Sequence, residues 1–247
     1  MSSSLNEPMT LKTLLVINPI FGFMDPLRAC NNSPTLLNPP IEFACKLQCF
    51  VHNPGAVDPD GDRLSYEITS SIGRNGLPPN GYVYPDDYMG VGANGDMQVN
   101  AATGDLTWGC PGAPPQYAGE FNVAMLIKEW RTIAGTEYLI GQTLRDIQID
   151  VLNICLNQPP VIADIKDTCV LAGTNLTFSV TATDPDSNNI ILSATGDPFG
   201  FTPPAVFTDT LGASPLSHNF SWTPDCNRVR LQPYFVYFYA VDTNLTV

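Results

Sequence analysis

Two stretches of this chain couple an extended run to an acidic turn, and this duplication limits what the chain can fold into. The first stretch is Gly55-Ala-Val-Asp-Pro-Asp-Gly-Asp, and the second is Val180-Thr-Ala-Thr-Asp-Pro-Asp-Ser-Asn. A motif that recurs together with its surroundings is typical of repeat proteins, in which each copy is one structural module. If the chain is a repeat array, we expect it to function in display or adhesion.

The similarity between the two segments continues beyond the turns, in the same order. The run Leu106-Thr-Trp-Gly-Cys110 matches Phe220-Ser-Trp-Thr-Pro-Asp-Cys226. Cys45 matches Cys169, and each is expected in the first strand of its module. Because order and spacing persist over most of both segments, the sequence predicts two copies of one module.

Linkers rich in Asn and Pro set the predicted module boundaries, because proline cannot continue a strand ladder. They begin near Asn31 and Asn157. The sequence predicts the closing strand of a preceding repeat with a linker over residues 1–30, a first repeat over residues 31–156 and a second over residues 157–247. The second repeat has no counterpart of the alternating run at residues 144–152, so we expect a truncated module and an internal fragment of a longer chain.

The composition favours strands over helices. The 23 prolines and 19 glycines are scattered without a period and separate short runs rich in Val, Ile, Thr, Phe and Tyr. Hydrophobic residues make up 44% of the chain, which is enough for cores, and charged residues make up 14%, too few for a disordered tail. The predicted fold is all-β, with tandem antiparallel β-sandwiches of which the last lacks its closing strand.

Charge and cysteine content restrict the partners and the compartment. A formal net charge of -13 opposes phosphate backbones and anionic membranes, so nucleic acid is not an expected partner. No run approaches the roughly 20 apolar residues of a spanning helix, and no membrane insertion is expected. The seven cysteines contain no CxxC motif and suit an oxidising compartment. The expected localisation is extracellular or at the cell surface.

The acidic turns, the Trp and Cys runs and the Asn-Pro-Pro linkers together resemble immunoglobulin-like and cadherin-like repeats of bacterial cell-surface proteins. In detail, residues 31–247 look most like repeats of large secreted Bacteroidetes proteins that carry a gliding-motility-associated C-terminal sorting domain. The resemblance implies an antiparallel β-sandwich, export across both membranes, and a place on the surface or in an extracellular assembly. The sorting domain itself is not among these residues.

The acidic turns are candidate calcium sites. Asp58, Asp60 and Asp62 are spaced by two, and Ca²⁺ takes 6 to 8 oxygen ligands, so we expect Glu129 to complete the first set. Glu129 ends the strand that aligns with the one ending in Asp242. The second set is Asp184, Asp186, Asn188 or Asn189, and Asp242. Asp-Pro-Asp-Gly is equally a strong turn sequence without a metal, and both interpretations stay open.

The alignment of the copies also pairs the cysteines. It predicts the bridges Cys45 to Cys110 and Cys169 to Cys226, each beside an equivalent tryptophan that is expected in the core. Cys30, Cys49 and Cys155 remain, and their pairing stays open, with Cys30 to Cys49 as one alternative.

The loop at residues 73–100 contains a candidate ligand-binding surface. Tyr82, Tyr84 and Tyr88 could offer flat rings to a surface glycan, and the alternative is a loop that packs on its own sheet. No catalytic residue is predicted, because the chain has only His52 and His218 and neither belongs to a nucleophile motif.

The N-terminal apolar run at residues 11–18 is a candidate donor strand. Its residues Leu14, Leu15, Val16 and Ile17 are expected to pair with a neighbouring subunit or with a free edge of the same chain.

For the whole chain, we expect a structural or adhesive repeat region of a secreted bacterial surface protein, stiffened by calcium. Its partners would be neighbouring repeats or copies of itself. The alternatives are a filament subunit that assembles by strand donation and a carbohydrate-binding module of an exported enzyme.

Overall fold

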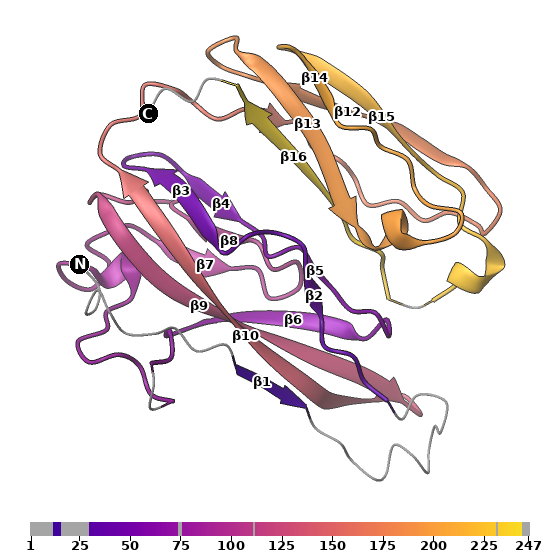
Figure 1. Cartoon of the computed structure of the whole chain (residues 1–247), viewed down its shortest axis with the longest axis horizontal. Coiled ribbons are helices and arrows are strands. Elements are labelled where there is room, and N and C mark those ends of the chain that lie inside the picture. Colours follow the sequence, from indigo (N-terminus) through magenta and orange to yellow (C-terminus); the bar gives the residue numbers. More distant parts are fainter. Residues whose placement is uncertain (1–11, 16–29, 74–75, 111, 231, 244–247) are drawn as a thin grey trace. The chain divides into compact units, whose positions relative to one another are not determined.

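All regular elements of the described chain are β-strands or short 3-10 turns (Figure 1). The computed structural model describes residues 12–15, 30–73, 76–110, 112–230 and 232–243, with side chains from residue 30 onward. The chain divides into two compact units, Met1–Ile154 (unit 1) and Cys155–Val247 (unit 2). The predicted all-β class is confirmed, and each unit is a β-sandwich in its own right.

Unit 1 consists of one large sheet, one smaller sheet and a short two-stranded ladder. The large sheet has the order β1-β10-β9-β6 with β3 also paired to β10, the smaller sheet is β4-β8-β7, and the ladder is β2-β5. The strands are β1 (Lys12–Leu15), β2 (Thr35–Leu36), β3 (Ile41–Cys45), β4 (Phe50–His52), β5 (Ala56–Val57), β6 (Arg63–Thr69), β7 (Met97–Val99), β8 (Leu106–Trp108), β9 (Gly119–Ile133) and β10 (Thr136–Leu152).

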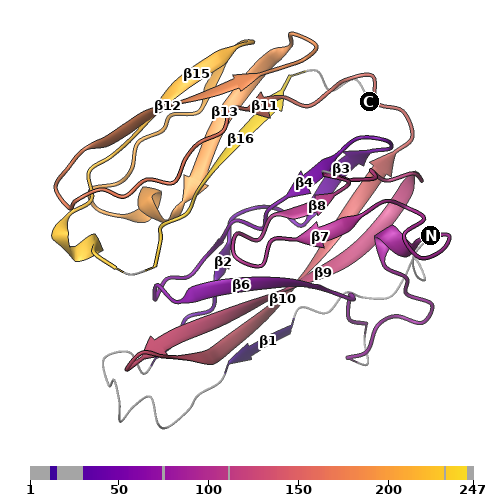
Figure 2. The same ribbon diagram turned by 180° about the vertical axis from the view of Figure 1, so that it is seen from behind.

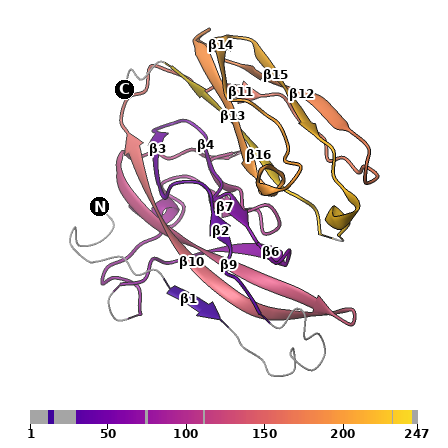
Figure 3. The same ribbon diagram turned by 45° about the vertical axis from the view of Figure 1, so that its right-hand side comes forward.

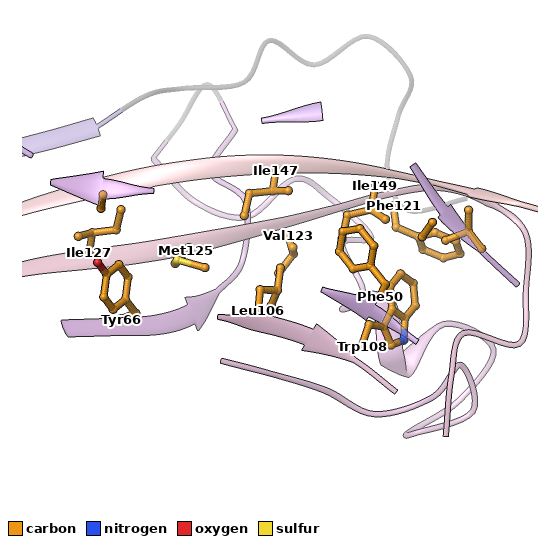
Figure 4. Packing of buried hydrophobic residues seen from close by; sticks show 13 residues of the cluster. Phe50, Tyr66, Leu106, Trp108, Phe121, Val123, Met125, Ile127, Ile147 and Ile149 are labelled. Atoms are coloured by element: carbon orange, nitrogen blue, oxygen red, sulfur yellow. The ribbon is translucent and has the colours of Figure 1, made fainter. Parts of the chain in front are cut away.

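The core of unit 1 lies between its two sheets and follows from the alternation of side chains along β9. Phe121, Val123, Met125 and Ile127 are two residues apart, so they share one face of the strand, and all are buried. Trp108 of β8 meets them from the facing sheet, with its ring edge-on to Phe121 at 5.3 Å between centroids. Figure 4 shows these side chains between the long and short strands. The predicted core position of Trp108 is confirmed.

Strand β10 has partners on both of its edges. It pairs antiparallel with β9 along most of its length, and its other edge is shared by β3 and β1 (Figure 3). The β3 pairing is parallel, which departs from the purely antiparallel sheet expected from the sequence. Leu14 and Leu15, predicted as part of a donor strand, lie in β1 opposite β10 of the same chain. Val16 and Ile17 lie outside the described residues.

Unit 2 contains two three-stranded sheets, β11-β12-β15 and β14-β13-β16 (Figure 2). Its core is rich in aromatic rings, with Phe220 5.0 Å from Phe178 and 5.8 Å from Phe238 between centroids. Trp222 is buried in the same cluster, as predicted. The strands are β11 (Val161–Ile162), β12 (Leu176–Thr183), β13 (Asn189–Gly196), β14 (Thr210–Ala213), β15 (Leu216–Trp222) and β16 (Val236–Asp242).

The strand registers of the two units match around their acidic turns. In unit 1, β2 pairs with β5 through Thr35 and Val57, and in unit 2 the matching pair is Val161 and Thr183. The strand after each acidic turn then pairs with a later strand through Leu64 and Glu129, or through Ile190 and Asp242. Glu129 and Asp242 therefore occupy equivalent positions, as the sequence predicts.

Unit 2 differs from unit 1 at the place that β10 occupies. Among the described residues, β16 pairs with β13 and no strand pairs with its other edge. Residues 167–171, which correspond to β3, belong to no strand and are mostly exposed. Because β3 is held by β10 in unit 1, the missing partner explains this difference. The prediction that Cys169 lies in a first strand is wrong.

The long loop at residues 73–100 is anchored by one buried asparagine. The side chain of Asn94 is inaccessible to solvent. Its Oδ1 accepts hydrogen bonds from the backbone N–H groups of Gln116 and Tyr117 at 2.7 and 2.8 Å, and its Nδ2 donates to the carbonyl of Pro85 at 2.9 Å. This stretch, expected to be an exposed loop, is therefore tied to the body of unit 1 at its centre.

Candidate metal centres

The first acidic turn is folded by its own leading carboxylate. Asp58 Oδ1 accepts hydrogen bonds from the backbone N–H groups of Asp60 at 3.0 Å and Asp62 at 2.9 Å. Gly61 has a φ of 76°, a value that glycine adopts without steric cost, and its N–H donates to the Asp58 carbonyl. The turn thus brings ligand atoms of all three aspartates within 4.8 Å of one another.

Glu129 of β9 adds a fourth carboxylate to this cluster. It is fully buried, although a carboxylate in a protein interior normally requires a partner. Its side chain lies over Gly141, the residue paired with it on β10, where a Cβ atom would be 2.4 Å from Glu129 Oε1. Glycine at this position therefore makes the space that the carboxylate occupies.

The linker that precedes unit 1's first strands is bound to the same cluster. Asn31 Nδ2 donates a hydrogen bond to Glu129 Oε2 at 2.6 Å, and the backbone N–H of Asn32 donates to Asp60 Oδ2, also at 2.6 Å. The Asn32 side chain donates to the other oxygen of Asp60 at 3.0 Å. The linker asparagines thus join the acidic turn to β9 through N–H groups that donate to the carboxylates.

Arg131 is a member of this cluster that sequence reasoning missed. Its side chain is only 3% exposed, and its guanidinium donates to both oxygens of Asp62. It also donates to the Cys30 carbonyl at 2.9 Å and to Asn31 Oδ1 at 2.8 Å, and it lies 3.7 Å from Asp60 Oδ2. The available signal was its position two residues after Glu129, which places both side chains on the same face of β9.

The electrostatics of the cluster favour the arrival of positive charge. Burial raises the pKa of Asp58 to about 7, and the neighbouring carboxylates of Asp62, Glu129 and Asp60 contribute to the shift. Burial likewise raises the pKa of Glu129. The hydrogen bond to Asp62 raises the pKa of the Arg131 guanidinium, which remains charged. Carboxylates crowded in this way are stabilised as anions by a nearby cation.

The second acidic turn, in unit 2, has the same internal hydrogen bonds. Asp184 Oδ1 accepts from the backbone N–H groups of Asp186 and Asn188, both at 2.9 Å. Ser187 stands where unit 1 has a glycine and adopts a φ of 61°, with its N–H donating to the Asp184 carbonyl. The turn geometry is therefore conserved between the two units despite the loss of the glycine.

The linker contacts of unit 2 also repeat those of unit 1. Asn157 Nδ2 donates to Asp242 Oδ2 at 2.7 Å, as Asn31 does to Glu129 in the first unit. The Gln158 N–H donates to Asp186 Oδ2 at 2.6 Å. Asn188 belongs to this cluster through a 2.7 Å hydrogen bond from its Nδ2 to Asn157 Oδ1. The neighbouring Asn189, the alternative ligand considered from the sequence, is the first residue of β13 and is exposed.

Three buried carboxylate oxygens in the two clusters make no hydrogen bond. They are Asp58 Oδ2 and Glu129 Oε1 in unit 1 and Asp184 Oδ2 in unit 2. Asp58 and Asp184 are equivalent residues, each 6% exposed, so the same oxygen is left unpaired in both copies. Unpaired buried oxygens beside further carboxylate and amide oxygens fit the preference of Ca²⁺ for oxygen ligands. The residues present therefore fit a hard divalent cation.

The predicted cysteine pairing is wrong. Cys110 is bridged to Cys49, with a Cα separation of 5.3 Å, and Cys45 is in a different disulfide. The register explains the choice, because Phe50, next to Cys49, pairs with Trp108, two residues before Cys110, whereas β3 with Cys45 pairs with β10 of the other sheet. Cys155 is also disulfide-bonded.

Cys169 and Cys226, predicted to bridge, are free thiols and both are exposed. Cys30 is free as well, so it does not bond to Cys49.

The three tyrosines predicted as a glycan-binding surface are partly engaged in contacts within unit 1. The Tyr82 hydroxyl donates to the Asn122 carbonyl at 3.0 Å, and burial raises the pKa of that hydroxyl. The Tyr88 ring contacts Tyr117 and Phe121 edge-on, which fixes it against the core. Tyr84 is the most exposed of the three at 37%. This arrangement is that of a loop packed on its own sheet.

Comparisons with known proteins do not assign the chain to a family. No family model and no curated protein matches it. Among solved structures, repeats EC1-2 of human protocadherin-24 align over 86% of this chain and 98% of that one, at 15% identity and a TM-score of 0.31. Dpr2 Ig1-Ig2, solved in complex with DIP-Theta Ig1-Ig3, aligns over 85% and 97%, at 10% identity and a TM-score of 0.26. Neither likeness is close enough to carry an argument about function.

Proposed function

We propose that this chain is a structural or adhesive repeat region of a secreted bacterial cell-surface protein, stiffened by calcium bound at its acidic clusters. The observation that carries the proposal is the equivalence of the two clusters, in which a linker asparagine, an acidic turn and a later strand meet through matching hydrogen bonds. A cation bound there would hold the start of each module to its end. The bacterial surface origin rests on the resemblance of the sequence motifs.

Further features support an extracellular place. Four cysteines of this chain are disulfide-bonded, namely Cys45, Cys49, Cys110 and Cys155. Structural disulfides persist in oxidising compartments. Within the described residues we find no helical segment with the length and hydrophobicity that a membrane crossing requires. The formal net charge of -13 also suits a calcium-rich exterior, where divalent cations reduce the repulsion between carboxylates.

Calcium dependence of thermal stability tests this proposal. Saturating Ca²⁺ should raise the melting temperature relative to EDTA, because an ion that binds only the folded state adds about 2.7 kcal/mol at a concentration of 100 times Kd. A variant with Asp58→Asn, Asp60→Asn, Asp184→Asn and Asp186→Asn should lose this shift. Asp209→Asn, an exposed acid outside both clusters, is the matched control and should keep it. A calcium shift that survives the fourfold change would contradict the proposal.

A second candidate function, filament assembly by strand donation, is favoured by the open edge of unit 2. Among the described residues no strand covers the outer edge of β16, whereas the equivalent β9 is covered by β10. The segment at residues 11–18 is a candidate occupant from a second copy, since main-chain hydrogen bonds along an edge accept an added strand. In the present structure its β1 portion pairs with β10 of its own chain.

Solution mass tests strand donation. If copies assemble in this way, the parent chain should form oligomers, and deletion of residues 1–18 should return it to a monomer in size-exclusion chromatography with light scattering. A parent chain that is monomeric at all concentrations would rule out strand donation between copies. Strand β1 would then pair only with β10 of its own chain.

A further inference from the structure

The two acidic clusters differ in charge at Asp62 and Arg131. Unit 1 has Asp62 bound to Arg131, whereas unit 2 has Asn188 in place of the aspartate, and the residue two positions after Asp242 in the sequence is the uncharged Asn244. Two contacts are shared: a linker asparagine donates to Glu129 or Asp242, and a linker backbone N–H donates to Asp60 or Asp186. Arg131 therefore adds to unit 1 a positive charge that unit 2 does not have at the matching sequence position.

Arg131 and Asn188 make the same contact with the linker. The Arg131 guanidinium donates to Asn31 Oδ1 at 2.8 Å, and the Asn188 amide donates to the equivalent Asn157 Oδ1 at 2.7 Å. The arginine additionally brings a full positive charge, which is 3.7 Å from Asp60 and is shielded from water at 3% exposure. Unit 1 therefore contains a cation of its own within the carboxylate cluster.

The two side chains differ in what a metal ion would have to displace. A guanidinium has five N–H donors and no acceptor, so Arg131 cannot itself be a ligand, and its hydrogen bonds occupy lone pairs of Asp62 and Asn31 that an ion would otherwise use. An asparagine amide carries an oxygen as well, and rotation of Asn188 converts it from a donor to Asn157 into a ligand. The ion would also be repelled by the charge on Arg131.

The basic residues of unit 2 are engaged away from its cluster. Arg230 is bound to Asp197 at 2.8 Å and Arg228 lies 3.9 Å from Asp225, while Lys166 is exposed. Asp184 Oδ2 is buried and makes no hydrogen bond. This oxygen can serve as a ligand, and the hydrogen bonds described for Asp184 and Asp186 come from backbone N–H groups.

We infer that Arg131 is a resident cation of the unit 1 cluster, and that a divalent cation of the calcium type binds selectively at the unit 2 cluster of Asp184, Asp186, Asn188 and Asp242. The inference rests on the proposed calcium function and narrows it to one of two equivalent sites. In unit 1, Arg131 keeps its hydrogen bonds to the linker at any calcium concentration. Unit 2 responds to the ion.

Calorimetric titration of the full chain with Ca²⁺ tests the inference through two matched variants. Asp184→Asn should weaken calcium binding by about tenfold or more, because ligand charge sets affinity in such sites. Asp58→Asn removes the equivalent carboxylate from unit 1 and should leave the affinity within about twofold of the parent. Loss of binding in Asp58→Asn, or equal weakening in both variants, would overturn the inference.

A double variant tests the role of Arg131 directly. Asp62→Asn with Arg131→Asn gives unit 1 the residues that unit 2 has at these two positions and should create a second calcium site, seen as a rise in stoichiometry from one to two. A stoichiometry of two in the parent chain overturns the inference. A parent chain that binds no calcium overturns the proposed calcium function itself, a pattern distinct from binding that depends on Asp58.

Discussion

Gly141 shows how a residue without a side chain shapes the first cluster. The buried carboxylate of Glu129 lies in the space that a Cβ at position 141 would fill, at 2.4 to 2.6 Å from its terminal atoms. The end of Glu129 is held by Asn31, so the carboxylate cannot retreat without losing a 2.6 Å hydrogen bond. Glycine is therefore needed at position 141 to leave space for the Glu129 carboxylate. It is not needed there to form a turn or to adopt a positive φ.

Gly141→Ala should destabilise unit 1 by about 1 to 3 kcal/mol, the usual cost of adding volume to a packed site. Urea unfolding measures this change. Gly200→Ala is the control, since a Cβ there meets nothing within 4 Å, and it should be close to neutral. If Gly141→Ala unfolds at the parent urea concentration, the carboxylate moves freely and the description of a fixed Glu129 is wrong.

At the scale of elements, the irregular segment at residues 73–100 depends on Asn94. This side chain is fully buried and makes three hydrogen bonds to backbone groups, one to Pro85 of the same segment and two from Gln116 and Tyr117 of the loop before β9. Its backbone carbonyl also accepts the indole N–H of Trp108 at 2.7 Å. Asn94 therefore links the segment to the core through hydrogen bonds, and Tyr88 of the same segment adds a ring contact with Phe121.

Asn94→Ala should lower the free energy of unfolding of unit 1 by about 3 kcal/mol or more, because an unsatisfied buried group costs about 1 to 3 kcal/mol and several would be left. The change should also expose residues 73–100 to limited proteolysis. Asn80→Ala, an exposed asparagine in the same loop, should alter neither measurement. Equal protease sensitivity of the two variants would show that Asn94 does not anchor the loop.

Which elements could be predicted from the sequence depends on whether they recur. The equivalence of Glu129 and Asp242 was predictable because the acidic turns fix the register of both copies, and the strand pairs agree with it. Arg131 has no charged counterpart in the second copy, so the comparison of copies gave no sign of it. The parallel pairing of β3 with β10 was missed because it depends on a strand that comes more than a hundred residues later.

At the scale of the whole molecule, the cysteines contradict the simpler expectation that the two units are identical modules. Alignment of the copies predicts a bridge in each unit, but the structure has Cys49 bonded to Cys110 and leaves Cys169 and Cys226 free. The two units are therefore equivalent in their acidic clusters and strand register, yet differ in covalent chemistry.

Thiol labelling of the native chain distinguishes these two arrangements. Iodoacetamide followed by intact-mass analysis should add three labels, at the exposed thiols of Cys30, Cys169 and Cys226, since exposed free thiols react and disulfides do not. Prior reduction under denaturing conditions should raise the number to seven, the full cysteine content. A native chain that takes a single label would mean that Cys169 and Cys226 are bridged after all, and unit 2 would then be closed by a disulfide as unit 1 is. Peptide mapping of the labelled residues completes the test by showing whether the four protected cysteines include Cys49 and Cys110.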